Sequence, residues 1–178
     1  GPGESRYIRI SDSDSDRGGY DFNLNYDKKF KNPKHKLTSY LRLSNGNNDG
    51  DNEYKNTEWE PYKELFENAD EARNGQNGKN AGFDLQVDYV RPFESGSKIE
   101  LGFSSKNNDR NDYQRAEIFD YTLNQFVNDN EFTNDFNFNE TVNAAYVQYG
   151  GSYWFIGYNA GLRFEMVNML SDLKSNPE

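Results

Sequence analysis

The sequence predicts an all-β fold, an antiparallel up-and-down transmembrane β-barrel, of which this chain forms a segment of about seven strands. The first observation is a strict alternation of apolar and polar residues over 154–166. The apolar positions are Trp154, Ile156, Tyr158, Ala160, Leu162, Phe164 and Met166. Such alternation is typical of a strand with one apolar face. The run exceeds the ~5–6 residues of a usual globular strand and matches the ~9–11 residues that cross a membrane.

The second observation is composition. The chain of 178 residues has 33% hydrophobic residues and a net charge of −10, and its mean hydropathy is −1.13. These values are typical of disordered chains, but an aromatic content of 16% is not. Strands that are apolar at every second position reconcile the two. A soluble β-sandwich or adhesin-like binding module reconciles them equally well, so composition leaves both open.

The third observation is that short and long connections alternate between the strongest predicted strands. The connections at 28–36, 92–97 and 150–152 are short, whereas 45–80 and 108–133 are long. Outer-membrane barrels have short periplasmic turns and long extracellular loops. The pattern therefore predicts that the two long segments lie outside the cell.

The first part of the chain is predicted to form a hairpin. Residues 5–10 are expected to be a short strand, and 11–19, made of Ser, Asp, Arg and Gly, a loop. Residues 20–27 alternate between apolar and polar positions, as a strand does. Pro33 interrupts the lysine-rich stretch that follows, and 37–44 is predicted to be the returning strand.

The middle of the chain is predicted to form a second hairpin from strands at 83–89 and 98–103. Within the long segment before it, residues 60–73 have apolar side chains at helical spacing. This predicts a short surface helix, with extension of the flanking strands as the alternative. The segment 108–133 after the hairpin is predicted to be a second long loop, with strand extension as the alternative because it contains Tyr113, Phe119, Tyr121, Phe126 and Phe132.

A third hairpin is predicted from 138–146 and 154–166, joined by a tight turn at Gly150 and Gly151. Its first strand is expected to place the even positions on the apolar face, namely Phe138, Glu140, Val142, Ala144 and Tyr146. Residues 168–178 show no pattern and are expected to be loose.

These elements make one domain, a β-barrel segment over 1–178 with long loops at 45–80 and 108–133 and a loose C-terminus. Single-chain bacterial barrels have an even number of strands, and large transporter barrels have about 22. The chain is therefore expected to be part of a larger barrel. The alternative is a small, self-contained eight-stranded outer-membrane barrel.

The third hairpin also resembles a known family. The residues that carry the resemblance are Asn143, Ala144, Ala145, Tyr146, Ala160, Gly161, Leu162, Arg163 and Glu165. They are similar to a hairpin in the barrel domain of TonB-dependent outer-membrane receptors of the Bacteroidetes type. The stretches 20–49 and 83–109 fit the same family, so the resemblance covers most of 20–167.

The resemblance implies a receptor in the outer membrane of a Gram-negative bacterium that takes up a nutrient through a plugged barrel. It implies outer-membrane lipid, the remainder of the barrel, the plug and TonB as partners, and no nucleic acid is expected. The substrate stays open among an iron chelate, an oligosaccharide and a peptide.

Two acidic clusters are weak candidates for a metal site. Asp12, Asp14 and Asp16 alternate before a pair of glycines, and acidic oxygens in a glycine-containing loop can wrap Ca²⁺. The EF-hand pattern is not followed, so a solvated acidic loop is the favoured interpretation and no cofactor is expected. The same applies to the second cluster, formed by Asn47, Asp49, Asp51 and Glu53.

No catalytic constellation is present in the sequence, and the chain is not expected to be an enzyme. It has no cysteine, and His35 is the single histidine. Charged residues on the predicted polar faces are expected either to contact a ligand or to pair across strands, and pairing is favoured. They are Arg42, Asp84, Asp88, Lys98, Glu100, Arg163 and Glu165.

Overall fold

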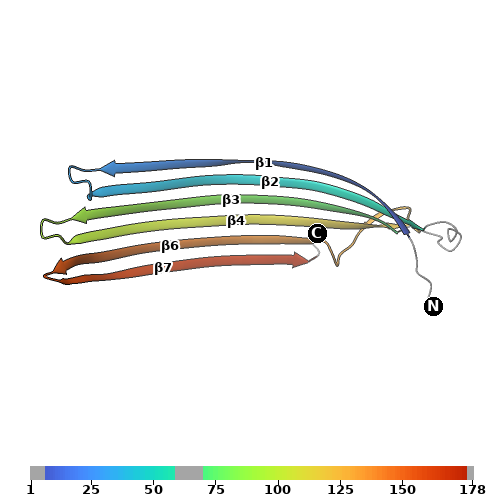
Figure 1. Cartoon of the computed structure of the whole chain (residues 1–178). Helices are drawn as coiled ribbons and strands as arrows, with labels where there is room; N and C mark the ends of the chain where they lie inside the picture. Colours follow the sequence, from blue (N-terminus) through green and yellow to red (C-terminus); the bar gives the residue numbers. More distant parts are fainter. Residues whose placement is uncertain (1–6, 59–69, 176–178) are drawn as a thin grey trace, which may run out of the picture.

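The computed structural model describes residues 7–58 and 70–175, and these form a single antiparallel sheet. Its strands are β1 (Tyr7–Lys29), β2 (Lys36–Glu58), β3 (Asp70–Pro92), β4 (Lys98–Asp120), β5 (Gln125–Asn128), β6 (Asn134–Tyr153) and β7 (Ile156–Ser175). The order across the sheet is β1-β2-β3-β4-β6-β7, with the short β5 paired to the end of β4. Figure 1 shows the long strands side by side in chain order. This is the predicted up-and-down topology.

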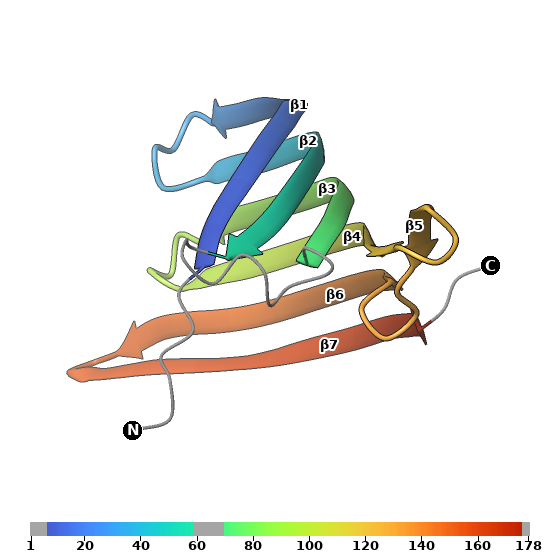
Figure 2. The same ribbon diagram turned by 90° about the vertical axis from the view of Figure 1, so that its right-hand side faces the viewer.

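The sheet is open, with β1 and β7 at its edges, and it curves along its length (Figure 2). Within the described residues no second sheet packs on it, so the β-sandwich alternative is wrong. In the same residues, no helix has the length and apolar character needed to cross a membrane.

The long strands extend much further than the apolar alternation indicates. The predicted loop 11–19 lies within β1 and pairs with 46–54 of β2. The predicted loop 45–80 consists mainly of the end of β2 and the start of β3. The rest of it, with most of the predicted helix, lies outside the described residues, whereas 70–73 belong to β3.

In 108–133 the alternative of strand extension is confirmed over the loop, and the prediction of a loose C-terminus is wrong. β4 continues to Asp120, and β5 lies inside the predicted loop. β7 continues to Ser175, so 168–175 are not loose. The physical reason is shared: these extensions are rich in Asn, Asp, Ser and Gly on both faces. They are held by backbone pairing to neighbouring strands, which leaves no apolar period in the sequence.

The continuous register sorts the side chains onto two faces. We call outer face the one that carries Leu24, Leu41, Leu85, Leu101 and Leu162, and inner face the one that carries Asn23, Asp84 and Asn159. Directly paired residues share a face, so one row links Leu24, Leu41 and Leu85 across three strands. The outer face is continuously apolar in the half of the sheet next to the short turns, and toward the loop end it is mainly polar with scattered apolar and aromatic residues.

The faces of β6 differ from the prediction. Val147 pairs with Leu162, and Ala145 pairs with Phe164, so the odd positions of β6 join the outer face. Tyr146 and the other even positions lie on the inner face, opposite Arg163 and its neighbours. The sequence misleads here because β6 has apolar residues on both faces.

The turn of this hairpin also differs from the prediction. Gly150 and Gly151 are paired within the strands, and the chain reverses at Trp154 and Phe155. Trp154 adopts a positive φ of 56°, which is uncommon for a residue other than glycine.

The apolar runs on the outer face are displaced from strand to strand. On β1 the run extends from Tyr20 to Tyr26, and the row through its centre reaches β7 at Val167. On β7 the run extends from Ile156 to Met166, so its centre lies about six residues closer to the turns than Val167 does. At ~3.3 Å per residue this displacement is ~20 Å along the strand. The five steps between strands cover ~24 Å at ~4.8 Å each. The strands therefore cross the apolar band at a tilt of about 40°, as strands of outer-membrane barrels do.

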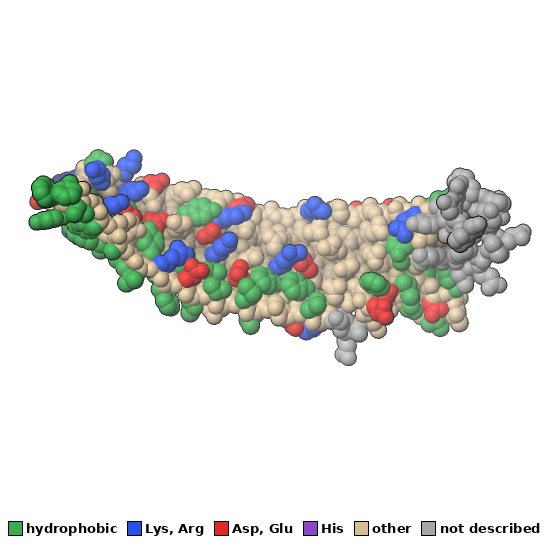
Figure 3. All heavy atoms as spheres, turned by 60° about the horizontal axis from the view of Figure 1, so that its bottom comes forward, with side chains coloured by type: hydrophobic (Ala, Val, Ile, Leu, Met, Phe, Trp, Pro, Cys, Tyr) green, Lys and Arg blue, Asp and Glu red, His purple; other side chains and the backbone are tan. Residues whose placement is uncertain are grey.

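The two ends of the sheet have different connections. At one end, the turn end, residues 30–35, 93–97 and 154–155 make short turns, which lie at the left of Figure 1. At the other end, the loop end, 121–133 connect β4 to β6 and include β5. Among the connections that the structure describes, the short ones and the long one thus lie at opposite ends, as predicted, whereas the connection between β2 and β3 lies outside the described residues. Figure 3 shows hydrophobic side chains gathered toward the turn end.

Aromatic residues cluster at the turn end. The rings of Phe30 and His35 stack with their centres 3.8 Å apart, and His35 Nε2 lies 2.9 Å from the hydroxyl of Tyr89. Tyr149 lies near Phe93 and Tyr158. Girdles of aromatic residues mark the boundary between lipid and water in membrane barrels.

A tyrosine on the inner face lies across a glycine of the neighbouring strand. The Tyr146 hydroxyl on β6 donates a hydrogen bond of 2.7 Å to Asp88 on β3, so the side chain spans β4. It passes over Gly102, where an added Cβ would lie 1.9 Å from Tyr146 Cε1. Only a residue without a Cβ leaves room for this ring.

We expect a charge on the outer face to block assembly when the same charge on the inner face does not. Leu162→Arg places a guanidinium in the apolar band, which costs ~2–4 kcal/mol near the middle of the membrane. Asn159→Arg is the matched control, because Asn159 lies on the inner face of the same strand. The measurement is the yield of folded protein in outer membranes. Equal yields for the two variants would refute the assignment of the faces.

We expect Gly102→Val to destabilise the sheet through Tyr146. The new side chain would displace the ring, and overpacking of this kind costs ~1–3 kcal/mol. Gly157→Ala is the control, because nothing lies within 4 Å of its added Cβ. The measurement is the urea midpoint in lipid vesicles. The double variant Gly102→Val with Tyr146→Ala should recover part of the loss, and no recovery would contradict the contact.

Candidate functional site

The two acidic clusters found in the sequence meet on the outer face near the loop end. Asp12, Asp14 and Asp16 lie at alternate positions of β1, and they pair directly with Glu53, Asp51 and Asp49 of β2. Sequence analysis identified both clusters but not their contact, because each was assigned to a separate loop. Carboxylates that face each other across strands repel.

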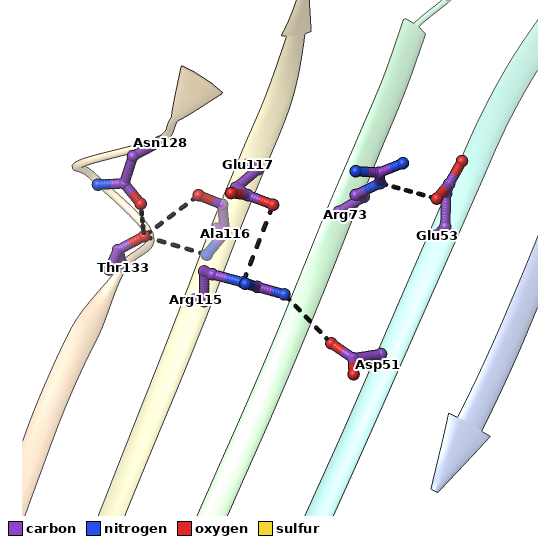
Figure 4. A network of polar contacts seen from close by, with 8 residues as sticks. All are labelled: Asp51, Glu53, Arg73, Arg115, Ala116, Glu117, Asn128 and Thr133. Atoms are coloured by element: carbon purple, nitrogen blue, oxygen red, sulfur yellow. Dashed lines mark hydrogen bonds and ion pairs between the residues drawn. The ribbon is translucent and has the colours of Figure 1, made fainter. Parts of the chain in front are cut away.

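Arginines from β3 and β4 lie against this acidic surface (Figure 4). Arg73 Nε lies 2.7 Å from Glu53 Oε2, and Arg115 Nη2 lies 3.3 Å from Asp51 Oδ1. Arg115 reaches Asp51 across Gly75, whose missing side chain leaves the path open. Of the six acidic residues that face each other across β1 and β2, Glu53 and Asp51 are the two with an ion pair in the part of the chain that the structure describes.

The metal site that Asp12, Asp14 and Asp16 suggest does not have the expected loop geometry. Alternate residues of a strand stand ~6.6 Å apart along it, so they do not wrap an ion as a loop does. Across the described ranges, no group of three or more acidic or histidine residues is placed to hold a metal ion.

Next to the acidic surface, a buried threonine fixes the start of β6. Thr133 is 1% exposed, and its hydroxyl accepts a hydrogen bond of 3.0 Å from the Ala116 amide. It lies 2.7 Å from Asn128 Oδ1, to which it donates. Ala116 lies where the partner of β4 changes from β6 to β5. Thr133 therefore connects β4 with the end of β5 at the point where β5 and β6 separate (Figure 4).

An aromatic and charged cluster covers the loop end of the outer face. Phe119 packs edge-on against Phe126, and the Arg73 guanidinium lies 3.8 Å from the centre of the Phe126 ring. Lys55 pairs with Glu71, which also accepts a hydrogen bond from the Tyr121 hydroxyl. The hydrogen bond from Lys55 lowers the pKa of Glu71 and, reciprocally, raises the pKa of Lys55. Sequence analysis identified Phe119, Tyr121 and Phe126 as candidates for strand extension. It gave no signal for their contacts with Arg73 and Glu71, which belong to another strand.

The inner face carries all seven charged residues that the sequence pointed to, and several of them are paired with neighbouring side chains. Arg42 Nε donates to Asp21 Oδ2 across strands at 2.9 Å. Arg163 Nη2 donates to Glu165 along the same strand at 2.7 Å, and Lys98 pairs in the same way with Glu100. Asp88 binds Tyr146 instead of a cation. The inner wall is thus polar, with charges held in place by neighbours within the sheet.

Comparison with known proteins gives a family for this arrangement. Residues 28–178 match the outer membrane protein beta-barrel family. The solved structures similar to the chain include the ferric citrate transporter FecA in its unliganded form, at 11% identity and a TM-score of 0.35. The match covers 79% of this chain and 22% of that one. Comparison with curated proteins gives no match.

The family match covers most of the chain, including all of β2 to β7. It agrees with the tilt of the strands, the apolar band on the outer face and the alternating connections. The apolar band is therefore the surface that contacts outer-membrane lipid, and the inner face is turned toward the barrel interior. The chain belongs to the outer membrane protein beta-barrel family.

Proposed function

We propose that this chain is part of the barrel of a TonB-dependent receptor of the Bacteroidetes type, which imports a nutrient across the outer membrane. The observation that carries the proposal is the open sheet of tilted strands. Unpaired backbone groups at β1 and β7 are not tolerated in lipid, so each edge needs another strand. Further strands that continue the same tilt would make a barrel wide enough to hold a plug.

The inner wall supports transport over catalysis. Several of its charged groups are engaged by neighbouring side chains, as in the pairs Arg42–Asp21 and Arg163–Glu165. A polar wall in which many charges are already paired offers a solute weak contacts spread over the surface. The extensions beyond the lipid band would surround the entrance on the extracellular side. In this function the plug and TonB are partners through the parent protein, and the chain needs no cofactor.

The proposal predicts that uptake depends on this protein and on TonB alike. A strain that lacks the protein and a strain that lacks TonB should fail on the same limiting nutrient. The measurement is growth on panels of iron chelates, oligosaccharides and peptides, with restoration by the intact gene as the control. A nutrient that depends on the protein but not on TonB would indicate a passive barrel instead. A barrel of eight strands, revealed by the size of the purified protein, would favour the smaller alternative.

The orientation is a separate expectation. Phe132 in the connection 121–133 and Trp154 at the turn end are both exposed, so chymotrypsin can reach either if it has access. We expect added protease to cut whole cells after Phe132 and to cut after Trp154 only once the outer membrane is opened. Cleavage after Trp154 in intact cells would reverse the orientation.

A further inference from the structure

The outer face changes its chemistry abruptly above the lipid band on β4, β6 and β7. The row through Phe103, Ala145 and Phe164 is apolar. Further toward the loop end the rows become polar, and amide and carboxylate side chains line a shallow groove there. The groove residues with side chains on the outer face are Asp109, Asn111, Asn137, Asn139, Leu170 and Asp172.

The amides of this groove are held in fixed orientations. Asp109 accepts hydrogen bonds from the Nδ2 atoms of Asn111 at 3.1 Å and Asn139 at 3.2 Å. Asp135 accepts one from Asn137 Nδ2 at 3.1 Å. Each amide thus uses its nitrogen within the sheet, so its carbonyl oxygen is available to accept from a ligand.

The height of the groove places it at the polar layer of the membrane. Met166 is the last residue of the apolar run on β7, and Leu170 follows four positions later on the same face. At ~3.3 Å per residue and a tilt of about 40°, this is ~10 Å above the edge of the lipid band. The headgroup layer adds ~5–8 Å on each side of the hydrocarbon core, so the groove lies at the outer edge of this layer, where a sugar attached to a lipid would extend.

The groove chemistry selects a headgroup class. Its lining residues include Asp109 and Asp172 but no lysine or arginine, so it does not complement a phosphate. Oriented amide oxygens accept hydrogen bonds from hydroxyl groups, and Leu170, which is 75% exposed, offers an apolar surface beside them. This combination fits a sugar ring, which has hydroxyl groups at its edge and C–H groups on its faces.

We propose that this groove binds the uncharged sugar headgroup of a glycolipid in the outer leaflet. The groove is continuous with the lipid-contacting surface below it, so a glycolipid can place its acyl chains on Phe164 and Leu162 and its sugar against Asn137 and Asn139. The interaction would anchor the barrel wall at a fixed height in the membrane. It does not depend on which solute, if any, passes through the barrel.

A nitroxide label beside the groove tests the proposal in the full-length protein. The chain has no cysteine, so Asn168→Cys gives one labelling site on the outer face and Met169→Cys gives its neighbour on the inner face. The label's collision rate with a water-soluble nickel chelate is compared in phosphatidylethanolamine vesicles with and without a neutral oligosaccharide glycolipid. We expect glycolipid to lower the rate at 168 by at least about twofold and to leave 169 unchanged.

A second variant ties the effect to the groove. Asn137→Ala with Asn139→Ala should abolish the fall at 168, and Asn108→Ala on the inner face should preserve it. An unchanged rate at 168, an equal fall at 169, or a fall that survives loss of both amides would overturn the proposal. So would an equal fall caused by free oligosaccharide in plain vesicles, which would indicate a site for soluble sugar. A collision rate at 168 that falls as more protein is placed in vesicles without glycolipid would indicate contact with a second copy of the chain and would also overturn the proposal.

Discussion

The structure depends on one constraint: every backbone amide and carbonyl in the lipid band must be bonded within the sheet. Between its two edge strands the sheet meets this constraint with an unbroken antiparallel register from β1 to β7, without a bulge between directly paired residues. Once the register is fixed, the period of two assigns each side chain to the lipid or to the interior. The faces, the tilt and the level of the polar groove all follow from this ladder.

Sequence patterns predict the part of the fold that touches lipid, because there one face must be apolar. Leu24, Leu85 and Leu162 alternate with polar residues, and all lie on the outer face as expected. Above the lipid, both faces of the sheet are in water, so neither face must be apolar. The segments around Asp14 and Asn52 therefore lack an apolar alternation, although they lie in the long strands β1 and β2. The prediction of the faces of β6 is wrong for a different reason. Phe138 on the inner face and Val147 on the outer face are both apolar, so the sequence does not show which face of β6 contacts lipid.

The acidic surface shows the same limit for candidate sites. Composition marks Asp14 and Asp51 as members of acidic clusters, and the register makes them direct neighbours. What the sequence cannot show is Arg115, which lies 64 positions from Asp51 and reaches it across another strand. Residues that are far apart in the sequence and meet only in the folded sheet leave no local pattern. The contacts of Thr133 with Ala116 and of Phe126 with Arg73 are missed for the same reason.

The contact between Tyr146 and Gly102 has a consequence for how the sheet reaches its register. A slip of β6 by one residue would exchange its faces and be rejected by lipid. A slip by two residues would keep every side chain on its face, so the hydrophobic pattern offers no protection against it. It would, however, place Tyr146 over Ser104 or Glu100, each of which has the Cβ that Gly102 lacks. The contact between Tyr146 and Gly102 therefore favours the native register over a two-residue slip, which the alternation of apolar and polar residues alone does not exclude.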